Sequence, residues 1–147
     1  TSRKDIREKR IMGIRYNIVR IKEHKFFGIG NTWIDYDQIN ITDKEKTIVD
    51  CLDKPQYCGG IVEVAKAIKN GEYDKYRLVE YTKKINNTGV IRRLGYLCDY
   101  LDVDINLPAI NTRSYLYLDP TMTHEGPKDS KWMLIVNLDE KILGDLE

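Results

Sequence analysis

Apolar side chains in the middle of the chain recur every three or four residues, the spacing that places them on one face of an α-helix. The two clearest stripes are Ile61, Val64, Ala65 and Ile68, and Val90, Leu94, Leu97 and Leu101. With two shorter stripes and the stop signals between them, they predict helices at about 43–53, 61–70, 74–86 and 89–102. The middle of the chain is therefore expected to be helical.

Polar and turn-forming residues mark where these helices begin and end. Thr42 and Glu45 have the S/T-x-x-E spacing of a capping box, in which each side chain binds a backbone N–H at the helix start. Pro55 ends or interrupts the first helix, and Asp74 can cap the third. Gly95 lies inside the fourth helix, where a glycine costs about 1 kcal/mol relative to alanine. We therefore expect another backbone to approach Gly95 closely.

Alternating and β-branched stretches on both sides of the helices predict strands. They cover residues 13–21, 32–36 and 38–41 before the helices, and 114–118 and 132–138 after them. Helices that are grouped in sequence, rather than alternating with strands, favour an α+β fold. We expect the first strands and the C-terminal strand pair to join one mixed sheet, with the helices on one side. Residues 1–12 are expected to be a basic tail or linker remnant, and 13–147 a single α+β domain.

Charge is distributed unevenly along the 147 residues, although the net charge is only +1. Residues 1–25 contain 9 Lys and Arg against 3 Asp and Glu. This basic start could approach phosphates, or it could be a solvated tail. The chain has no signal peptide and no apolar run near the roughly 20 residues that span a bilayer, so a cytoplasmic protein without a membrane partner is expected. Because it begins at Thr1 without a Met, we expect a fragment of a longer protein.

Three cysteines and two histidines are the residues that could bind a soft metal. Cys51 and Cys58 are too far apart for the usual zinc-knuckle spacing, and His24 and His124 are distant in sequence. We therefore expect no metal site and no cofactor. An odd cysteine count without a secretory signal favours reduced thiols, whereas a local Cys51–Cys58 disulfide is the alternative for a hyperthermophilic source.

Enzymatic alternatives rest on weak patterns. The sequence has no G-x-S-x-G and no phosphate-binding glycine loop. A metal-dependent nuclease would need two carboxylates and a lysine, which Asp119, Asp139 and Lys141 could provide around the last predicted strand. Solvated turn charges explain the same pattern, because acid-x-Lys triplets arise by chance in a chain this rich in both residue types. We therefore expect no catalytic residues and keep a nuclease-related domain as an alternative.

Four cations near the third and fourth helices are candidates for binding nucleic acid or a partner. They are Lys83, Lys84, Arg92 and Arg93. Adjacent residues on a helix point about 100° apart, so one arginine can face solvent while the other reaches a neighbouring helix. We expect Arg93 to be structural, paired with a carboxylate such as Asp50 or Asp99. Arg92 and the two lysines could then contact phosphate.

Several segments share a family pattern. Residues 45–55 read EKTIVDCLDKP and are followed by Cys58-Gly59-Gly60, residues 92–97 read RRLGYL, residues 118–120 read LDP, and residues 132–137 read WMLIVN. In this order the segments resemble the C-terminal domain of the AbiEi family, with Lys46 in place of the family's arginine. These proteins are antitoxins and transcriptional regulators of abortive-infection, or type IV, toxin–antitoxin systems, which defend against phage.

The resemblance implies a non-enzymatic regulatory domain with antitoxin activity against a nucleotidyltransferase-like toxin. It also implies that a parent protein represses its own promoter through an N-terminal winged helix, which binds operator DNA and is absent from this sequence. We interpret the family-motif residues as a scaffold that holds two helices at a tight angle, with a binding groove between these helices as the functional alternative. These scaffold residues are Glu45, Thr47, Asp50, Gly59, Gly60 and Gly95. A protein-interaction module without a DNA role remains a further alternative.

Overall fold

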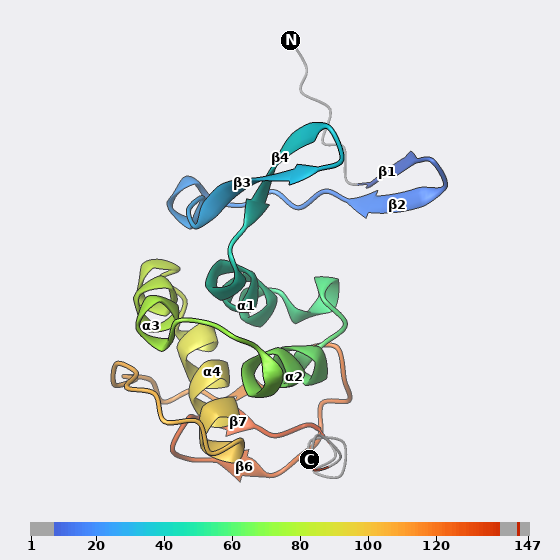
Figure 1. Ribbon diagram of the computed structural model, residues 1–147. Coiled ribbons are helices and arrows are strands. Elements are labelled where there is room, and N and C mark those ends of the chain that lie inside the picture. Colours follow the sequence, from blue (N-terminus) through green and yellow to red (C-terminus); the bar gives the residue numbers. More distant parts are fainter. Residues whose placement is uncertain (1–7, 139–143, 145–147) are drawn as a thin grey trace.

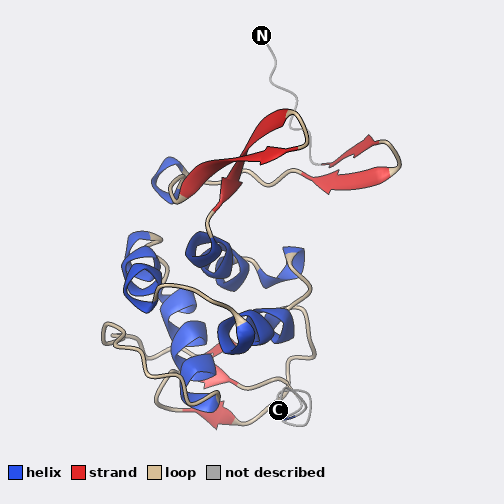
Figure 2. Cartoon of the chain, viewed as in Figure 1, coloured by secondary structure: helices blue, strands red, loops and turns tan. Residues whose placement is uncertain are grey.

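Four helices make up most of the regular secondary structure in the computed structural model, which describes residues 8–138 and 144 (Figure 1). They are α1 (Lys44–Asp53), α2 (Ile61–Asn70), α3 (Lys75–Lys84) and α4 (Thr88–Tyr100). All four predicted helices are therefore confirmed, with ends that differ from the prediction by at most two residues. Strands precede and follow them, which confirms the α+β class (Figure 2). Among the described helices, none is both long and apolar enough to cross a bilayer.

The N-terminal strands form two separate antiparallel hairpins. β1 (Glu8–Ile11) pairs with β2 (Ile14–Asn17), and β3 (Ile29–Ile34) pairs with β4 (Asp37–Thr42). A short 3-10 helix, η1 (Glu23–Lys25), lies between them. Both hairpins lie on one side of the helices, so that they form an arm, here defined as residues 8–42 (Figure 1). β1 falls inside the segment that the sequence assigns to a basic tail.

The C-terminal strands form a small mixed sheet at the opposite end of the helices. Its order is β5 (Leu116–Tyr117), β7 (Leu134–Ile135) and β6 (Lys128–Asp129), with β5 parallel and β6 antiparallel to β7. The expectation that this sheet also includes the N-terminal strands is wrong. Tight turns, with left-handed backbone at Gly13 and Asp35, fold each N-terminal strand back onto its neighbour. The helices then separate the two groups of strands.

The apolar core lies where α1, α2 and α4 meet and continues down to the small sheet. Val49 and Leu52 of α1 are buried against Ile61 and its neighbours on α2, and the stripe predicted for α4 points into the same cluster. Leu118 and Leu134 extend the core into the sheet. Another 3-10 helix, η2 (Pro55–Tyr57), connects α1 to α2, so Pro55 does end the first helix.

Helix α1 begins one residue later than the predicted capping box requires. β4 runs through Thr42, and Asp43 is the N-cap, accepting from the Lys46 backbone N–H at 2.8 Å. The capping box at Thr42 and Glu45 is therefore wrong. Glu45 Oε1 instead accepts the Asp74 backbone N–H at 2.7 Å, which joins the start of α1 to the start of α3.

Gly95 is a point of close approach, but the approaching group is a side chain and not the expected backbone. A Cβ atom built on Gly95 would lie 2.3 Å from the Trp132 ring, a distance that no real Cβ tolerates. The Trp132 indole also donates to Asp99 Oδ2 at 2.6 Å. The glycine inside α4 therefore allows the loop before β7 to pack flat on the helix.

We predict that Leu94→Ala lowers the free energy of unfolding by about 2–5 kcal/mol, because it removes a fully buried side chain at the contact of α4 with the core. Urea denaturation followed by circular dichroism measures the change. The matched control is Tyr76→Ala on α3, where the native side chain is 77% exposed and the change should stay within about 0.5 kcal/mol. Equal effects in the two variants would contradict this assignment of the core.

Candidate functional site

Arg92 and Arg93, predicted as binding cations, both lie in the interior. They are only 2% and 9% exposed, so the expectation that Arg92 faces solvent is wrong. The Arg92 guanidinium donates to three backbone carbonyls, those of Ser114 at 2.8 Å, Trp132 at 2.9 Å and Met133. Burial lowers the pKa of the Arg92 guanidinium, yet its donors are satisfied by the chain itself. This side chain fastens α4 to the segments that lead into β5 and β7.

Arg93 joins three parts of the fold in the same way. It donates to the carbonyls of Leu52 at the end of α1 (2.9 Å), Leu118 (3.0 Å) and Tyr117 (3.2 Å). Burial lowers the pKa of Arg93, an effect that the charges of Asp119 and Asp53 partly oppose. The structural role expected for Arg93 is observed, but its partners are carbonyls and not the carboxylates proposed from sequence. A sheet of two-residue strands leaves such carbonyls without ladder partners, and a guanidinium fork suits them.

Asp119 caps helix α2 from far along the chain. Its Oδ2 accepts the Ile61 backbone N–H at 2.7 Å, and its Oδ1 accepts the N–H and hydroxyl of Thr121 at 2.8 and 2.6 Å. Gly60 precedes Ile61 with a φ of 91°, and a Cβ there would lie 2.8 Å from Asp119 Oδ2. Gly60 is therefore needed both for its backbone conformation and for access of the carboxylate to the helix start.

Asn137 holds Asp119 in this position. The Asp119 N–H donates to Asn137 Oδ1 at 2.9 Å, and Asn137 Nδ2 donates to the carbonyls of Asp119 and Thr123 at 2.6 and 2.8 Å. Of the proposed nuclease trio, Asp119 thus serves as a cap, whereas Asp139 and Lys141 lie outside the described residues. Within the described part of the chain, no three acidic, histidine or cysteine side chains are placed to hold a metal ion.

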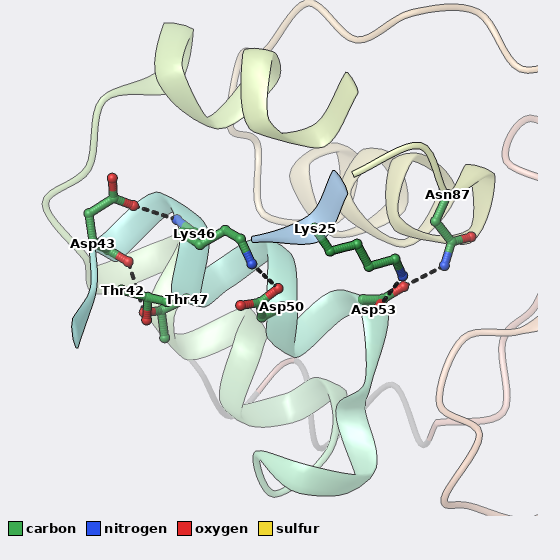
Figure 3. Close-up of polar contacts among 8 residues, drawn as sticks. All are labelled: Lys25, Thr42, Asp43, Lys46, Thr47, Asp50, Asp53 and Asn87. Atoms are coloured by element: carbon green, nitrogen blue, oxygen red, sulfur yellow. Dashed lines mark hydrogen bonds and ion pairs between the residues drawn. The ribbon is translucent and has the colours of Figure 1, made fainter. Parts of the chain in front are cut away.

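Polar side chains follow one another along α1 and its N-cap, and Figure 3 shows Asp43, Lys46, Thr47 and Asp50 among them. Lys46 is 1% exposed, forms an ion pair with Asp50, and lies 4.9 Å from the centre of the Phe27 ring. Thr47 donates its hydroxyl to the Asp43 carbonyl at 2.8 Å and contacts the Thr42 hydroxyl at the same distance. Lys46 therefore forms an ion pair with a carboxylate one turn along the helix.

The remaining predicted cations, Lys83 and Lys84, are exposed on α3. Lys83 pairs with Glu80 at 2.9 Å, and the Lys84 ammonium lies 4.6 Å from the centre of the Phe27 ring. The structure therefore does not bring the four predicted cations together. Two fasten the sheet to α4, and two lie on the surface beside the arm.

Asp53 at the end of α1 anchors the arm to the helices. Lys25 Nζ lies 2.6 Å from one carboxylate oxygen, and Asn87 Nδ2 donates to the other at 2.6 Å (Figure 3). Burial raises the pKa of Asp53, but the hydrogen bonds and charge of Lys25, with Asn87, outweigh it, so the pKa is lowered overall. Phe27 adds an edge-to-face contact with Tyr81, with ring centres 5.0 Å apart.

The outer faces of the two hairpins expose large apolar side chains. Strand register places Ile11, Ile14 and Tyr16 on one face of β1–β2, with Arg10 and Arg15 opposite each other on the other face. The same reasoning groups Ile34, Ile39 and Ile41 on one face of β3–β4. Alternation within each strand indicated such faces, the pairing shows which residues share them, and the exposure of these side chains shows that no described element covers them.

Cys51 and Cys58 are thiols, and Cys98 is a third. Both Cys51 and Cys58 line a groove of about 210 Å³ between the arm and the α1–η2 turn, with Val19 and Ile21 on the arm side. Cys58 Sγ lies 3.3 Å from the Pro55 carbonyl. Burial first, and then the neighbouring Cys58, raise the pKa of Cys51 to about 12.

We predict that Arg93→Met lowers the free energy of unfolding by more than about 3 kcal/mol, because three buried carbonyls lose their donor. Guanidinium denaturation measures the loss. Lys83→Met, which removes an exposed cation paired only at the surface, should change stability by less than about 1 kcal/mol. A mild effect at Arg93 would show that these carbonyls find other partners.

We predict that iodoacetamide alkylates Cys51 slowly at pH 8 and faster as the pH approaches 12, with mass spectrometry of tryptic peptides as the measurement. The raised pKa keeps the thiol protonated when folded, whereas an unfolded cysteine titrates near about 8.5. The contribution of the protonated Cys51 thiol to the free energy of unfolding is fully present below the unfolded pKa of about 8.5. It is lost as the pH rises from there through the folded pKa of about 12. In urea at pH 8 the reaction should be fast, and equal rates with and without urea would refute the burial argument.

Comparisons with known proteins identify no relative of the chain. No family model, curated protein or solved structure matches the chain. The AbiEi resemblance therefore stays a prediction that rests on the motif residues themselves. Their observed contacts, and the uncovered faces of the arm, are what a functional proposal can use.

Proposed function

We propose that the chain is a non-enzymatic regulatory domain of an antitoxin-type transcriptional regulator, which acts by binding a macromolecular partner through its arm. One observation carries this proposal: large apolar side chains are concentrated on hairpin faces that no described element covers. Of the large apolar residues exposed in the described chain, most lie between Ile11 and Ile41. Clustered exposed apolar surface commonly marks an interaction site.

Hairpin physics supports a partner for this arm. A two-stranded hairpin alone is marginally stable in water, and it gains stability when one face is covered. Each hairpin here has such a face, and Trp33 and Tyr36 near the tip of β3–β4 add large exposed rings. Aromatic side chains are enriched among residues that dominate binding energy at interfaces. The arm therefore has the composition of a binding surface.

The contacts of the motif residues support the non-enzymatic part of the proposal. Glu45 accepts from the start of α3, Asp119 caps α2, and Arg93 holds three carbonyls. Each of these charged groups forms hydrogen bonds with the backbone of the fold. They act as the scaffold that the resemblance implies, and we place the binding surface on the arm; a groove of about 140 Å³ between α1 and α2 is the alternative.

The resemblance supplies the identity of the partner. It implies a nucleotidyltransferase-like toxin, for which the apolar hairpin faces offer a protein-binding surface. It also implies support of promoter binding, for which Arg10 and Arg15, side by side on one face of β1–β2, offer charge that suits DNA phosphates. The uncovered apolar faces equally favour the second candidate, a protein-interaction module without a DNA role.

We predict that a nucleotidyltransferase-like toxin is encoded beside the gene and that the chain neutralises it, measured as restored growth of cells that express the toxin. Ile34→Ser with Ile39→Ser should abolish the rescue and weaken binding at least tenfold, because two apolar contacts on one hairpin face are lost. Tyr76→Ser, an exposed aromatic on α3, is the matched control and should leave rescue intact.

Two outcomes would refute this function. One is that no toxin encoded beside the gene is neutralised by the unaltered chain. The other is cleavage of plasmid DNA with Mg²⁺ or Mn²⁺ that Asp139→Ala abolishes, which would favour the nuclease alternative. Rescue of growth without salt-dependent DNA binding would identify the interaction module instead.

A further inference from the structure

We propose that the cavity where the arm meets the helices is a binding site for phosphate groups of a nucleotide or of a nucleic-acid strand. The cavity has a volume of about 390 Å³, and its lining is about half polar and half apolar. Its walls are Arg20, Ile21, Lys22, His24, Lys25, Lys54, Asn86 and Asn87. They come from the segment between β2 and β3, from the end of α1 and from the turn between α3 and α4.

Positive charge dominates this lining. Four of its residues are Lys or Arg and one is His, and among the described residues that line the cavity none carries a carboxylate. Asp53 lies beside the cavity, with both of its oxygens bound by Lys25 and Asn87, and Glu23 lies between the lining residues Lys22 and His24 in the chain. The charge of Lys25 is thus offset, whereas Lys22 forms no ion pair with any described residue. Lys22 and Lys54 are therefore the cations on which we base the positive field that favours an oxyanion.

Helix α4 adds to that field. Asn87 is its N-cap, and the 13-residue helix directs its positive end toward this side of the turn. The Asn87 side chain is held on both sides, with Oδ1 accepting from Gly89 and Nδ2 donating to Asp53. Asn86, with a left-handed φ of 52°, brings a second amide to the wall. Amide donors and lysine ammonium groups are the chemistry that binds phosphate oxygens.

Size and rigidity suit a ligand larger than one ion. A volume of about 390 Å³ lies within the range of small-molecule sites, which is about 300–1,000 Å³. The Lys25–Asp53–Asn87 contacts fix the three walls relative to one another before any ligand arrives. Pre-organised charge of this kind lowers the entropy lost on binding. The site is separate from the apolar hairpin faces, so either proposal can fail without the other.

The test is titration of the ¹⁵N-labelled chain with pyrophosphate, a nucleoside triphosphate and a short DNA duplex, followed by NMR and calorimetry. We expect amide shifts at Lys22, Lys54 and Asn87. Lys22→Ala with Lys54→Ala should weaken binding at least tenfold and reduce the salt dependence of duplex binding by about 1 to 2 units of log–log slope. Lys66→Ala with Lys69→Ala, which removes the same charge from α2, is the matched control.

The probes also distinguish the two sources of phosphate. Tighter binding of the triphosphate than of the duplex identifies a nucleotide site, and the reverse order identifies a nucleic-acid backbone. The proposal is overturned if no probe shifts these amides, or if the α2 control weakens binding as much as the cavity variant does. Equal melting temperatures of the two variants confirm that both are folded, and Lys22→Arg with Lys54→Arg should retain binding.

Discussion

Two buried guanidinium groups, those of Arg92 and Arg93, hold the C-terminal sheet against α4 and the end of α1. The strands β5 and β7 are each two residues long, too short to satisfy their own backbone by sheet pairing. Arg92 and Arg93 add donors from α4 to backbone carbonyls in and beside these strands, and Arg93 also reaches the last turn of α1. Removing a charge from water is costly, and a lone buried carbonyl is costly too. Hydrogen bonds between the guanidinium groups and the carbonyls offset both costs. These bonds fix where the sheet lies against the helices.

Other buried charged residues of the scaffold also bind backbone groups that would otherwise lack a partner. A binding surface is therefore better sought among residues without such contacts. Asp119 is buried because the start of α2 needs an acceptor, and Glu45 because the start of α3 does. Among the charged motif residues, Glu45, Arg92, Arg93 and Asp119 therefore bind backbone groups, whereas Lys46 and Asp50 pair with each other. The surface that has no such internal role is the arm, where isoleucines and aromatic rings face outward. Binding is consequently better assigned to the arm than to the motif residues.

Local patterns predicted the helices well because each is set by neighbouring residues. The stripe from Val90 to Leu101 placed Leu94 and Leu97 in the core, as observed. What the sequence could not predict are pairings across the chain. Asp119 and Ile61 meet although 58 residues separate them, and nothing in their local sequence specifies that contact. The wrong mixed sheet, the wrong partners of Arg93 and the unforeseen cavity beside Lys54 share this cause, because long-range geometry chooses among equally acceptable donors and acceptors.

The proposed sites on the arm and in the cavity share one structural joint. The cavity wall includes Lys25, whose contact with Asp53 also anchors the arm to α1. A phosphate in the cavity would lie beside this joint without contacting the apolar hairpin faces, because the cavity lining and those faces share no residue. The two proposed sites can therefore be tested independently, each with variants that leave the lining of the other unchanged.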